Sequence, residues 1–232
     1  MRTSNLARVR EDFDTIARLS DTYGSGSDRY DAFLAGQVRV RARRVLDIGC
    51  GLGRLAARLT APGREVLGVD LSPEMIARAR TSSAGTPGLR FECGDFFDLD
   101  PRDGRFDCVL SAAVLHHMDA DAAIARMIRL LSPGGRLILH DLRADDSLAD
   151  RARAAWALAH LALGRLLRTG RLRSPKVVRE AWARHGAGEV YLTFREAGSL
   201  AARMLPGSVM HYHWLWRYTI VWDRMSAASG LG

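Results

Sequence analysis

Hydrophobic residues between positions 45 and 141 recur in two alternating patterns. Short apolar runs with the length of buried β-strands occur at 45–49, 65–70, 89–92, 106–111 and 135–141. Apolar residues spaced three or four positions apart, as on one face of a helix, occur at 53–60, 73–80 and 121–131. Right-handed crossovers would bring such strands into one mostly parallel sheet with helices on both faces. The pattern therefore predicts an α/β fold.

Regions with a different pattern flank this core. Ahead of it, apolar residues at helical spacing predict helices at 4–20 and 30–40, with a Gly-Ser-Gly-Ser segment at 24–27 between them. Behind it, we expect helices at 148–168, 175–184 and 193–204, the last with Thr193 as its N-cap, and an aromatic, β-branched strand at 211–222. The expected regions are an N-terminal helical cover at 1–40, a core at 41–142, a helical insert at 143–190, and a final helix and strands completing the sheet at 191–225.

The first core strand ends in a glycine-rich loop at 47–53, which reads Asp-Ile-Gly-Cys-Gly-Leu-Gly. Glycines at alternate positions allow a ligand to approach the backbone closely and permit positive φ angles in a sharp strand-to-helix turn. The third glycine comes one residue earlier than in the dinucleotide pattern Gly-x-Gly-x-x-Gly, where Arg54 stands instead. Asp47 adds a carboxylate that would repel a pyrophosphate and attract a cation. The loop therefore favours a sulfonium ligand.

Five motifs in order carry a family resemblance. The loop at 47–53 resembles motif I of the class I S-adenosylmethionine-dependent methyltransferases, and segments similar to four later motifs follow at 68–72, 92–96, 106–111 and 131–137. The resemblance implies a doubly wound, Rossmann-like, seven-stranded sheet that is mostly parallel and has an antiparallel last strand. The run at 211–222 resembles the closing hairpin of the family, in which the last strand is inserted antiparallel beside the fifth. The resemblance also implies S-adenosylmethionine as the cofactor and a small-molecule methyltransferase as the activity.

The same resemblance assigns residues to the cofactor. Asp70 would accept the two ribose hydroxyls, Asp95 would accept the adenine amine, and Asp47 would attract the ammonium of the methionine end. Leu71 and Phe96 would flank the adenine ring. The complete set of cofactor-binding residues that it implies is Asp47, Gly49, Gly51, Gly53, Asp70, Leu71, Asp95, Phe96 and Ser111.

Catalysis in this family is an in-line displacement, so that positioning alone supplies up to roughly 7–11 kcal/mol of the barrier reduction. For a hydroxyl acceptor, a neutral histidine acting as general base adds roughly 10²–10⁴-fold. His116 and His117 follow the fourth strand and are the catalytic candidates, with His117 favoured; a purely structural role for the pair is the alternative. Further candidates are Tyr23, His140, Asp141, His185 and Tyr191.

A metal site is not expected. His211 and His213 alternate on one face of the last predicted strand, but no third ligand at metal-binding spacing is evident. The cysteines at 50, 93 and 108 form no Cys-x-x-Cys pair and are interpreted as small buried residues in a reducing compartment. Because no apolar run has the length of a membrane span and residues 1–19 do not resemble a signal peptide, we expect a cytoplasmic protein.

The net charge of +8 is concentrated in one segment, because residues 151–184 hold nine basic residues and one acidic residue. An anionic partner or an anionic group of the substrate would therefore meet the helical insert. Its helix at 148–168 is apolar around more than half of its circumference and needs partners on two sides. A lid over the substrate, a homodimer contact and a surface resting on lipid are the alternatives.

The leading hypothesis is methyl transfer to an oxygen, rather than a nitrogen or carbon, of an apolar or aromatic metabolite, with secondary metabolism suggested by family analogy. Methylation of RNA through the basic insert is an alternative. Against it, the sequence after the fourth strand is Ser-Ala-Ala-Val at 111–114 and lacks the Asn/Asp-Pro-Pro-Tyr/Phe motif of adenine amine methylation. A non-catalytic subunit that binds S-adenosylmethionine and a nicotinamide dehydrogenase complete the alternatives.

Overall fold

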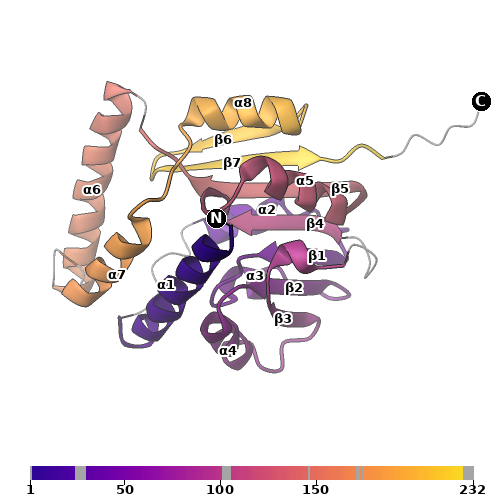
Figure 1. The fold of residues 1–232 in the computed structure, drawn as a ribbon, viewed down its shortest axis with the longest axis horizontal. Helices are drawn as coiled ribbons and strands as arrows, with labels where there is room; N and C mark the ends of the chain where they lie inside the picture. The colour runs from indigo at the N-terminus through magenta and orange to yellow at the C-terminus, as the bar shows by residue number, and fades with distance from the viewer. Residues whose placement is uncertain are drawn as a thin grey trace, which may run out of the picture.

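One seven-stranded sheet forms the centre of the protein. The computed structural model describes residues 2–23, 30–100, 106–145, 147–170, 173 and 175–226 of the 232 residues, so the predicted segment 24–27 lies outside the described part. The strands are β1 (Arg44–Ile48), β2 (Glu65–Asp70), β3 (Leu89–Cys93), β4 (Phe106–Ala112), β5 (Leu131–Leu142), β6 (Val209–His213) and β7 (Arg217–Asp223). They lie in the order β3-β2-β1-β4-β5-β7-β6 (Figure 1).

The sheet confirms the predicted fold class. Strands β1 to β5 pair in parallel, and β7 is inserted antiparallel between β5 and β6. Parallel neighbours need long crossovers, and helices supply them here. Strand β7, the last in the chain, is antiparallel to both of its neighbours, as the family resemblance implies.

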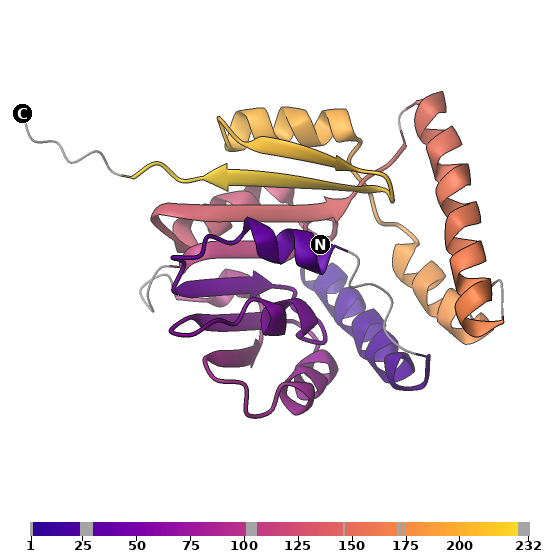
Figure 2. The same ribbon diagram turned by 180° about the vertical axis from the view of Figure 1, so that it is seen from behind.

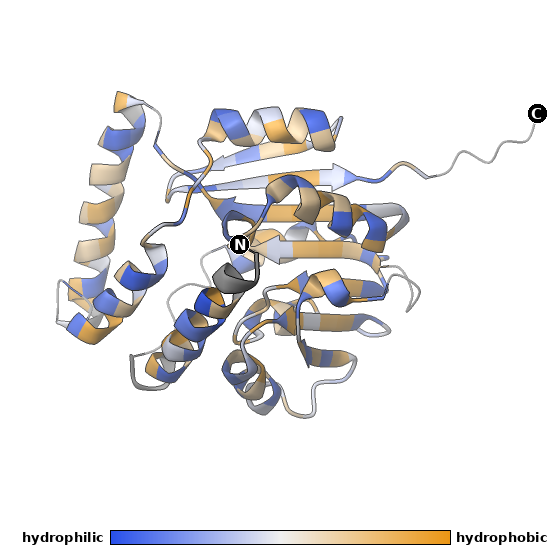
Figure 3. Ribbon diagram, in the orientation of Figure 1, coloured by the Kyte–Doolittle hydropathy of each residue, from blue (hydrophilic) through white to orange (hydrophobic). Residues whose placement is uncertain are grey.

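Alternation along the strands produces two cores, one on each face. Leu46, Ile48 and Val109 face a core with α5 (Ala120–Leu130) and α8 (Phe194–Met204). Val45 and Leu110 point the opposite way, towards α2 (Asp31–Gln37), α3 (Arg54–Arg58) and α4 (Pro73–Ser82). Because both faces are covered, the central strands are mostly apolar, as Figure 3 shows for most of β4. Figure 2 shows α2 lying across the second face.

Three helices stand at one end of the sheet. They are α1 (Arg2–Tyr23), α6 (Leu148–Thr169) and α7 (Lys176–Gly186), and they lie at the end towards which β4 points (Figure 1). Helix α1 packs between α4 and α7 through a small apolar cluster of Ile16, Ala17, Met75 and Ala181. The Ser72 hydroxyl, which caps α4, also donates a hydrogen bond to the Asp14 carboxylate. The N-terminal helix is thus fastened over the ends of the parallel strands.

Core boundaries agree closely with the pattern. The run at 211–222, which has strand propensity throughout, is a hairpin as the family resemblance implies: residues 214–216 turn the chain between β6 and β7, with Trp216 at φ 52. The run contains no Gly, Pro or Asn that would indicate a turn. The Thr193 N-cap is also confirmed: its hydroxyl accepts the Glu196 N–H at 3.2 Å, and the Glu196 carboxylate accepts the Thr193 N–H at 2.8 Å.

Helix α6 stands away from the sheet and leaves many apolar side chains exposed. Trp156 is 65% and Leu167 78% exposed, although Trp156 lies 5.5 Å from the ring of Trp214. A helix with this pattern needs a second partner, and the described residues leave much of its surface without one. None of the described helices combines the length and the apolarity that crossing a bilayer requires.

Candidate functional site

A pocket of about 1250 Å³ opens at the carboxyl ends of β1, β2 and β4. Its walls come from distant parts of the chain: the glycine loop after β1, the residue that ends β2, helix α1, the short 3₁₀ helix η2 (Leu115–His117), and α7 with the segment that follows it. Ligands of open α/β sheets bind at this edge, outside the carboxyl ends of the strands. The pocket is therefore the candidate site.

The glycine loop adopts the backbone that its spacing predicts. Gly49, Gly51 and Gly53 have φ angles of 69°, 52° and 74°. A Cβ at Gly49 would lie 2.2 Å from Val114 Cγ2, whereas one at Gly51 would meet no atom within 4 Å. Gly49 thus lets the loop pack against the end of β4, and Gly51 exposes its backbone to the pocket.

Substituting Gly49 by alanine should lower the free energy of unfolding by about 2–4 kcal/mol, since a left-handed φ costs roughly 1–2 kcal/mol and overpacking costs about as much again. Gly85→Ala is the matched control, because Gly85 has φ 79 but open space at its Cβ. Urea unfolding should show the larger loss in Gly49→Ala and a partial recovery in Gly49→Ala/Val114→Ala. Equal losses at Gly49 and Gly85 would contradict the packing argument.

Asp70 is the last residue of β2, and its carboxylate holds the backbone of the glycine loop by hydrogen bonds. One carboxylate oxygen accepts the Gly51 N–H at 2.8 Å, and the other accepts the Ser72 N–H at 2.9 Å. Burial raises the pKa of Asp70, and those two N–H groups oppose the shift. Each oxygen keeps a second lone pair, so the carboxylate can hold the loop and still accept hydroxyl groups from a ligand.

Asp47 is the most unusual acid of the site. It is 2% exposed, and its Oδ2 atom accepts no hydrogen bond from the described residues. Burial, together with the charges of Asp70 and Asp31, raises the pKa of Asp47 to about 8. A buried carboxyl group that faces two further acids across a pocket creates a centre that favours a positively charged ligand.

Most of the predicted cofactor residues meet in this pocket. Its described lining includes Asp47, Gly49, Gly51, Asp70, Leu71, Asp95 and Phe96. Gly53 and Ser111 are not part of that lining: Gly53 lies at the N-cap of α3, and Ser111 is buried within β4. Ala112 and Ala113, which follow Ser111, line the pocket instead. Asp95 also accepts the Phe97 N–H at 3.0 Å, which fixes the loop after β3.

The predicted catalytic pair also lines this pocket, on the 3₁₀ helix that follows β4. His116 Nδ1 is 2.6 Å from Asp141 Oδ1, and the Asp141 carboxylate also accepts the His116 backbone N–H at 2.9 Å. His117 Nδ1 lies 3.1 Å from Glu189 Oε2. Burial, with a contribution from neighbouring His116, lowers the pKa of His117 to about 4, so that its imidazole is neutral at neutral pH.

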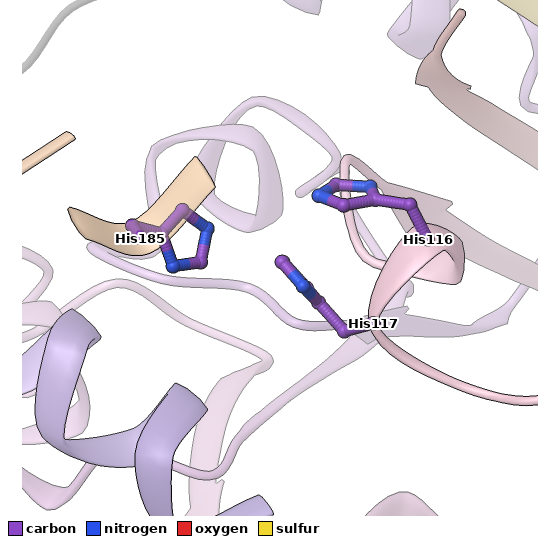
Figure 4. A group of neighbouring side chains, drawn as sticks. All are labelled: His116, His117 and His185. Atoms are coloured by element: carbon purple, nitrogen blue, oxygen red, sulfur yellow. The ribbon is translucent and has the colours of Figure 1, made fainter. Parts of the chain in front are cut away.

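A third histidine joins this pair. His185 of α7 lies 4.9 Å from His117 between ring centroids, and its Nδ1 is 3.6 Å from Asp12 Oδ2 of α1 (Figure 4). Burial lowers the pKa of His185. The sequence analysis named His185 and Asp141 as secondary candidates but missed Asp12 and Glu189, since no motif surrounds either acid.

Other candidates lie elsewhere or contribute differently. His140 is buried in β5, where its Nδ1 lies 2.8 Å from Thr219 Oγ1, and His213 Nε2 is 2.8 Å from the same oxygen. Neither histidine lines the described pocket, whereas Tyr191 does; the side chain of Tyr23 lies outside the described part.

The arginines of the pocket do not come from the basic segment. The described lining contains Arg8, Arg54 and Arg217, but no basic residue of 151–184. The insert contributes apolar side chains and His185 through α7, while no residue of α6 lines the pocket. The expectation that an anionic substrate group meets the insert's positive charge finds no support in this geometry.

Comparisons with known proteins agree with this arrangement. Residues 46–139 match the family model described as a methyltransferase domain. An uncharacterised methyltransferase of Mycobacterium bovis is 39% identical over 109 residues, which are 47% of this chain and 55% of that protein. A ubiquinone biosynthesis O-methyltransferase of Bradyrhizobium is 39% identical over 101 residues, 43% of this chain and 40% of that protein. The chain thus spans about half or less of the length of these curated relatives.

A solved structure extends the similarity over the remaining chain. The plantazolicin methyltransferase BpumL, crystallised with a triazolic desmethyl analogue of plantazolicin and S-adenosylhomocysteine, superimposes with a TM-score of 0.66 at 13% identity. The match covers 97% of this chain and 98% of that chain. At this identity the likeness establishes the fold, including the N-terminal and inserted helices, and nothing about the substrate.

Proposed function

We propose that this chain, whose residues 46–139 form a class I methyltransferase domain, binds S-adenosylmethionine and transfers its methyl group to an oxygen of a small apolar or aromatic molecule. The observation that carries the proposal is the buried, partly unsatisfied Asp47 beside Asp70 at the glycine loop. A donor with a sulfonium and an ammonium group supplies the positive charge that these acids lack in the protein. A nicotinamide dinucleotide would instead bring a pyrophosphate to them.

The donor fits the pocket residue by residue. The ammonium would lie at Asp47 and the ribose diol at Asp70, whose oxygens each retain one lone pair. The adenine would lie between Leu71 and Phe96, with its amine donating to Asp95. Gly49, Gly51 and Gly53 shape the loop around the methionine end, and the backbone near Ser111 completes that wall through Ala112 and Ala113.

The reaction needs little from the protein beyond alignment. A lone pair of the acceptor oxygen attacks the methyl carbon, the carbon–sulfur bond breaks, and its electron pair stays on sulfur. The products are a methyl ether or ester, S-adenosylhomocysteine and the proton that the hydroxyl loses. Holding sulfur, methyl carbon and oxygen in line supplies up to roughly 7–11 kcal/mol.

The acceptor side of the pocket supports an apolar or aromatic substrate. Phe13, Trp182 and Tyr191 line it together with His116 and His117. Arg217 also lines this pocket, and burial lowers its pKa because it disfavours the guanidinium cation. An anionic group on the acceptor would offset that cost, so an anionic acceptor is compatible with the pocket. We assign His117 and His116 to the acceptor hydroxyl, because the pair lines the same cavity as the glycine loop and follows the end of β4.

The test is transfer of a labelled methyl group. Purified protein with labelled S-adenosylmethionine should modify members of a panel of phenols and hydroxylated aromatic acids, and His117→Ala should slow that reaction by roughly 10²–10⁴-fold. Label that enters only amines or RNA would contradict the proposed acceptor class. Binding of S-adenosylmethionine without transfer to any acceptor would instead support a non-catalytic subunit.

RNA methylation is disfavoured by the position of the positive charge. The basic residues of 151–184 do not line the described pocket, and Ala112, Ala113 and Val114 stand at its wall where adenine amine methylation would need its Asn/Asp-Pro-Pro-Tyr/Phe motif. Filter binding across salt concentrations should therefore show only weak RNA affinity. Tight binding with a steep salt dependence would favour the RNA hypothesis.

The cellular compartment and the metabolic context of the reaction are proposed from the cysteines and from family analogy. Cys50, Cys93 and Cys108 are free thiols, which is consistent with a reducing cytoplasm; Cys50 and Cys108 are buried as expected, whereas Cys93 is exposed. We retain secondary metabolism as the proposed context, on the analogy of small-molecule methyltransferases. In the insert, we assign α7 to the substrate wall and the exposed face of α6 to a homodimer contact.

A further inference from the structure

Three histidines from two distant segments gather at the acceptor end of the pocket. His116 and His117 come from η2, and His185 comes from α7, almost seventy residues later. One ring nitrogen of each lies within 4.8 Å of those of the other two (Figure 4). His117 and His185 are buried, and His116 is partly buried with a side chain that is 5% exposed. Such a cluster is costly to build from neutral imidazoles that serve no common ligand.

Each of these histidines meets a carboxylate of its own through the same ring atom. Nδ1 of His116 lies 2.6 Å from Asp141, Nδ1 of His117 lies 3.1 Å from Glu189, and Nδ1 of His185 lies 3.6 Å from Asp12. Histidines that bind metals usually hold a carboxylate or carbonyl with the nitrogen that does not face the metal, which fixes the tautomer. The His116–Asp141 contact is a hydrogen bond, whereas the Glu189 and Asp12 contacts are ion-pair distances at the same ring atom. With Nδ1 of each ring directed to a carboxylate, Nε2 is the nitrogen that would bind a shared ligand.

We propose that His116, His117 and His185 bind one divalent transition-metal ion through Nε2, with Asp141, Glu189 and Asp12 as the carboxylates that orient them. Zinc is the ion that three imidazoles and one open position suit best. Zinc–nitrogen bonds of 2.0–2.1 Å in a tetrahedron place the nitrogens about 3.4 Å apart, so binding requires the rings to close by about an ångström. This site contradicts the expectation of no metal, which rested on His211 and His213.

The surroundings suit a catalytic rather than a structural ion. Phe13 packs 4.7 Å from His185 and 5.7 Å from His117 between ring centroids, and the Tyr191 ring lies 5.0 Å from that of His116. This aromatic shell limits the access of water, while the three histidines themselves line the open pocket. A zinc ion with three protein ligands keeps its fourth position for water or substrate.

The ion would activate the acceptor, a step that rests on the proposed methyl transfer. The acceptor oxygen would bind at the fourth position, where a metal lowers the pKa of a bound hydroxyl, and its proton would leave to water. The oxygen would then attack the methyl carbon as before, and the carbon–sulfur electron pair would remain on sulfur. The histidines would act as ligands, and no histidine would need to accept the proton.

Metal titration of the full chain tests the site without any acceptor. Protein stripped with a chelator and dialysed should bind one Co²⁺ per chain with micromolar or tighter affinity and show the visible absorption of a four-coordinate ion, which Zn²⁺ displaces. Alanine at His116, His117 or His185 should weaken Zn²⁺ binding by at least about 100-fold. Asp12→Asn should weaken it about 10–100-fold, the usual cost of losing an orienting partner.

His160→Ala is the matched control, because His160 is exposed on α6 and should leave the affinity unchanged. Circular dichroism on each variant confirms that it is folded, and Asp12→Asn keeps all three imidazoles. Metal affinity no tighter than millimolar in the wild type, or equal affinity in the three alanine variants and the control, would overturn the site.

Titration of S-adenosylmethionine into the same preparations separates the metal site from the proposed function. Donor binding without metal binding refutes the metal site alone, and metal binding without donor binding refutes the proposed function alone.

Discussion

Asp47→Asn is expected to weaken S-adenosylmethionine binding by about 150- to 4000-fold and, at the same time, to stabilise the empty protein. Removing one partner of a buried charge pair costs about 3–5 kcal/mol, which corresponds to that range of affinity. In the absence of donor, the same carboxyl group is buried with no cation beside it, and its pKa is raised to about 8. The variant replaces it with a neutral group of similar shape.

The dependence of folding stability on pH tests the predicted stabilisation by Asp47→Asn. The pKa of Asp47 lies near 8 in the folded protein, above the ordinary value of 3.8, so the folded state binds the extra proton between those pH values. The stability of the empty wild type should therefore fall as pH rises from about 4 to 8, and the variant should lose this fall. Thermal unfolding should show a melting temperature difference that widens over the range. A constant difference would contradict the assignment.

Donor binding should be coupled to the same proton. The ammonium of S-adenosylmethionine favours the ionised carboxylate, so binding at pH 7 should release a proton from Asp47. Calorimetric heats of the wild type should then depend on the ionisation enthalpy of the buffer, and affinity should rise between pH 6 and 8. Both effects should vanish in Asp47→Asn. Asp107→Asn is a control, because Asp107 accepts the Arg43 and Arg44 N–H groups away from the pocket.

Asp70→Asn should weaken donor binding by roughly 10²–10⁴-fold. Two hydrogen bonds to a charged group are worth about 1.5–3 kcal/mol each, and the ribose diol would make both. Asp70 also holds Gly51 and Ser72, so the variant alone does not separate loop support from ribose recognition.

A 2′-deoxy analogue of S-adenosylhomocysteine separates the two roles. It should bind the wild type about 10-fold or more weaker than the parent compound, but should lose little further affinity in Asp70→Asn. Such non-additivity indicates direct contact between Asp70 and the ribose. Fully additive losses in calorimetric titrations would show that Asp70 acts only by bracing the loop.

Local signals account for what the sequence predicts well. The core strands and helices follow from apolar periodicity, and the glycine loop follows from three glycines that all adopt positive φ, with close packing at Gly49 and Gly53. The acids at strand ends meet because the carboxyl ends of parallel strands share one edge of the sheet. Asp47, chosen for its charge at the strand end, and Asp70, chosen from the family resemblance, both line the pocket.

The acceptor side has no such local signal. Asp12, His117, His185 and Glu189 come from separate segments, and only the packing of α1 against α7 brings them together. The positive charge of the insert also misled the sequence analysis, because charge along a helix does not reveal which face lines a cavity. The turn at 214–216 has no local signal either, because Trp216 takes a left-handed φ without a turn residue, and only the family resemblance implies the hairpin.

The central claim is that the pocket at the ends of β1, β2 and β4 holds an adenosine-bearing sulfonium donor. A crystal structure of the protein with S-adenosylhomocysteine measures this most directly. We predict the ribose hydroxyls within hydrogen-bonding distance of the Asp70 carboxylate, the amino group beside Asp47, and the sulfur directed towards His116 and His117. Density for the compound elsewhere, or an empty pocket at saturating ligand, would contradict the account.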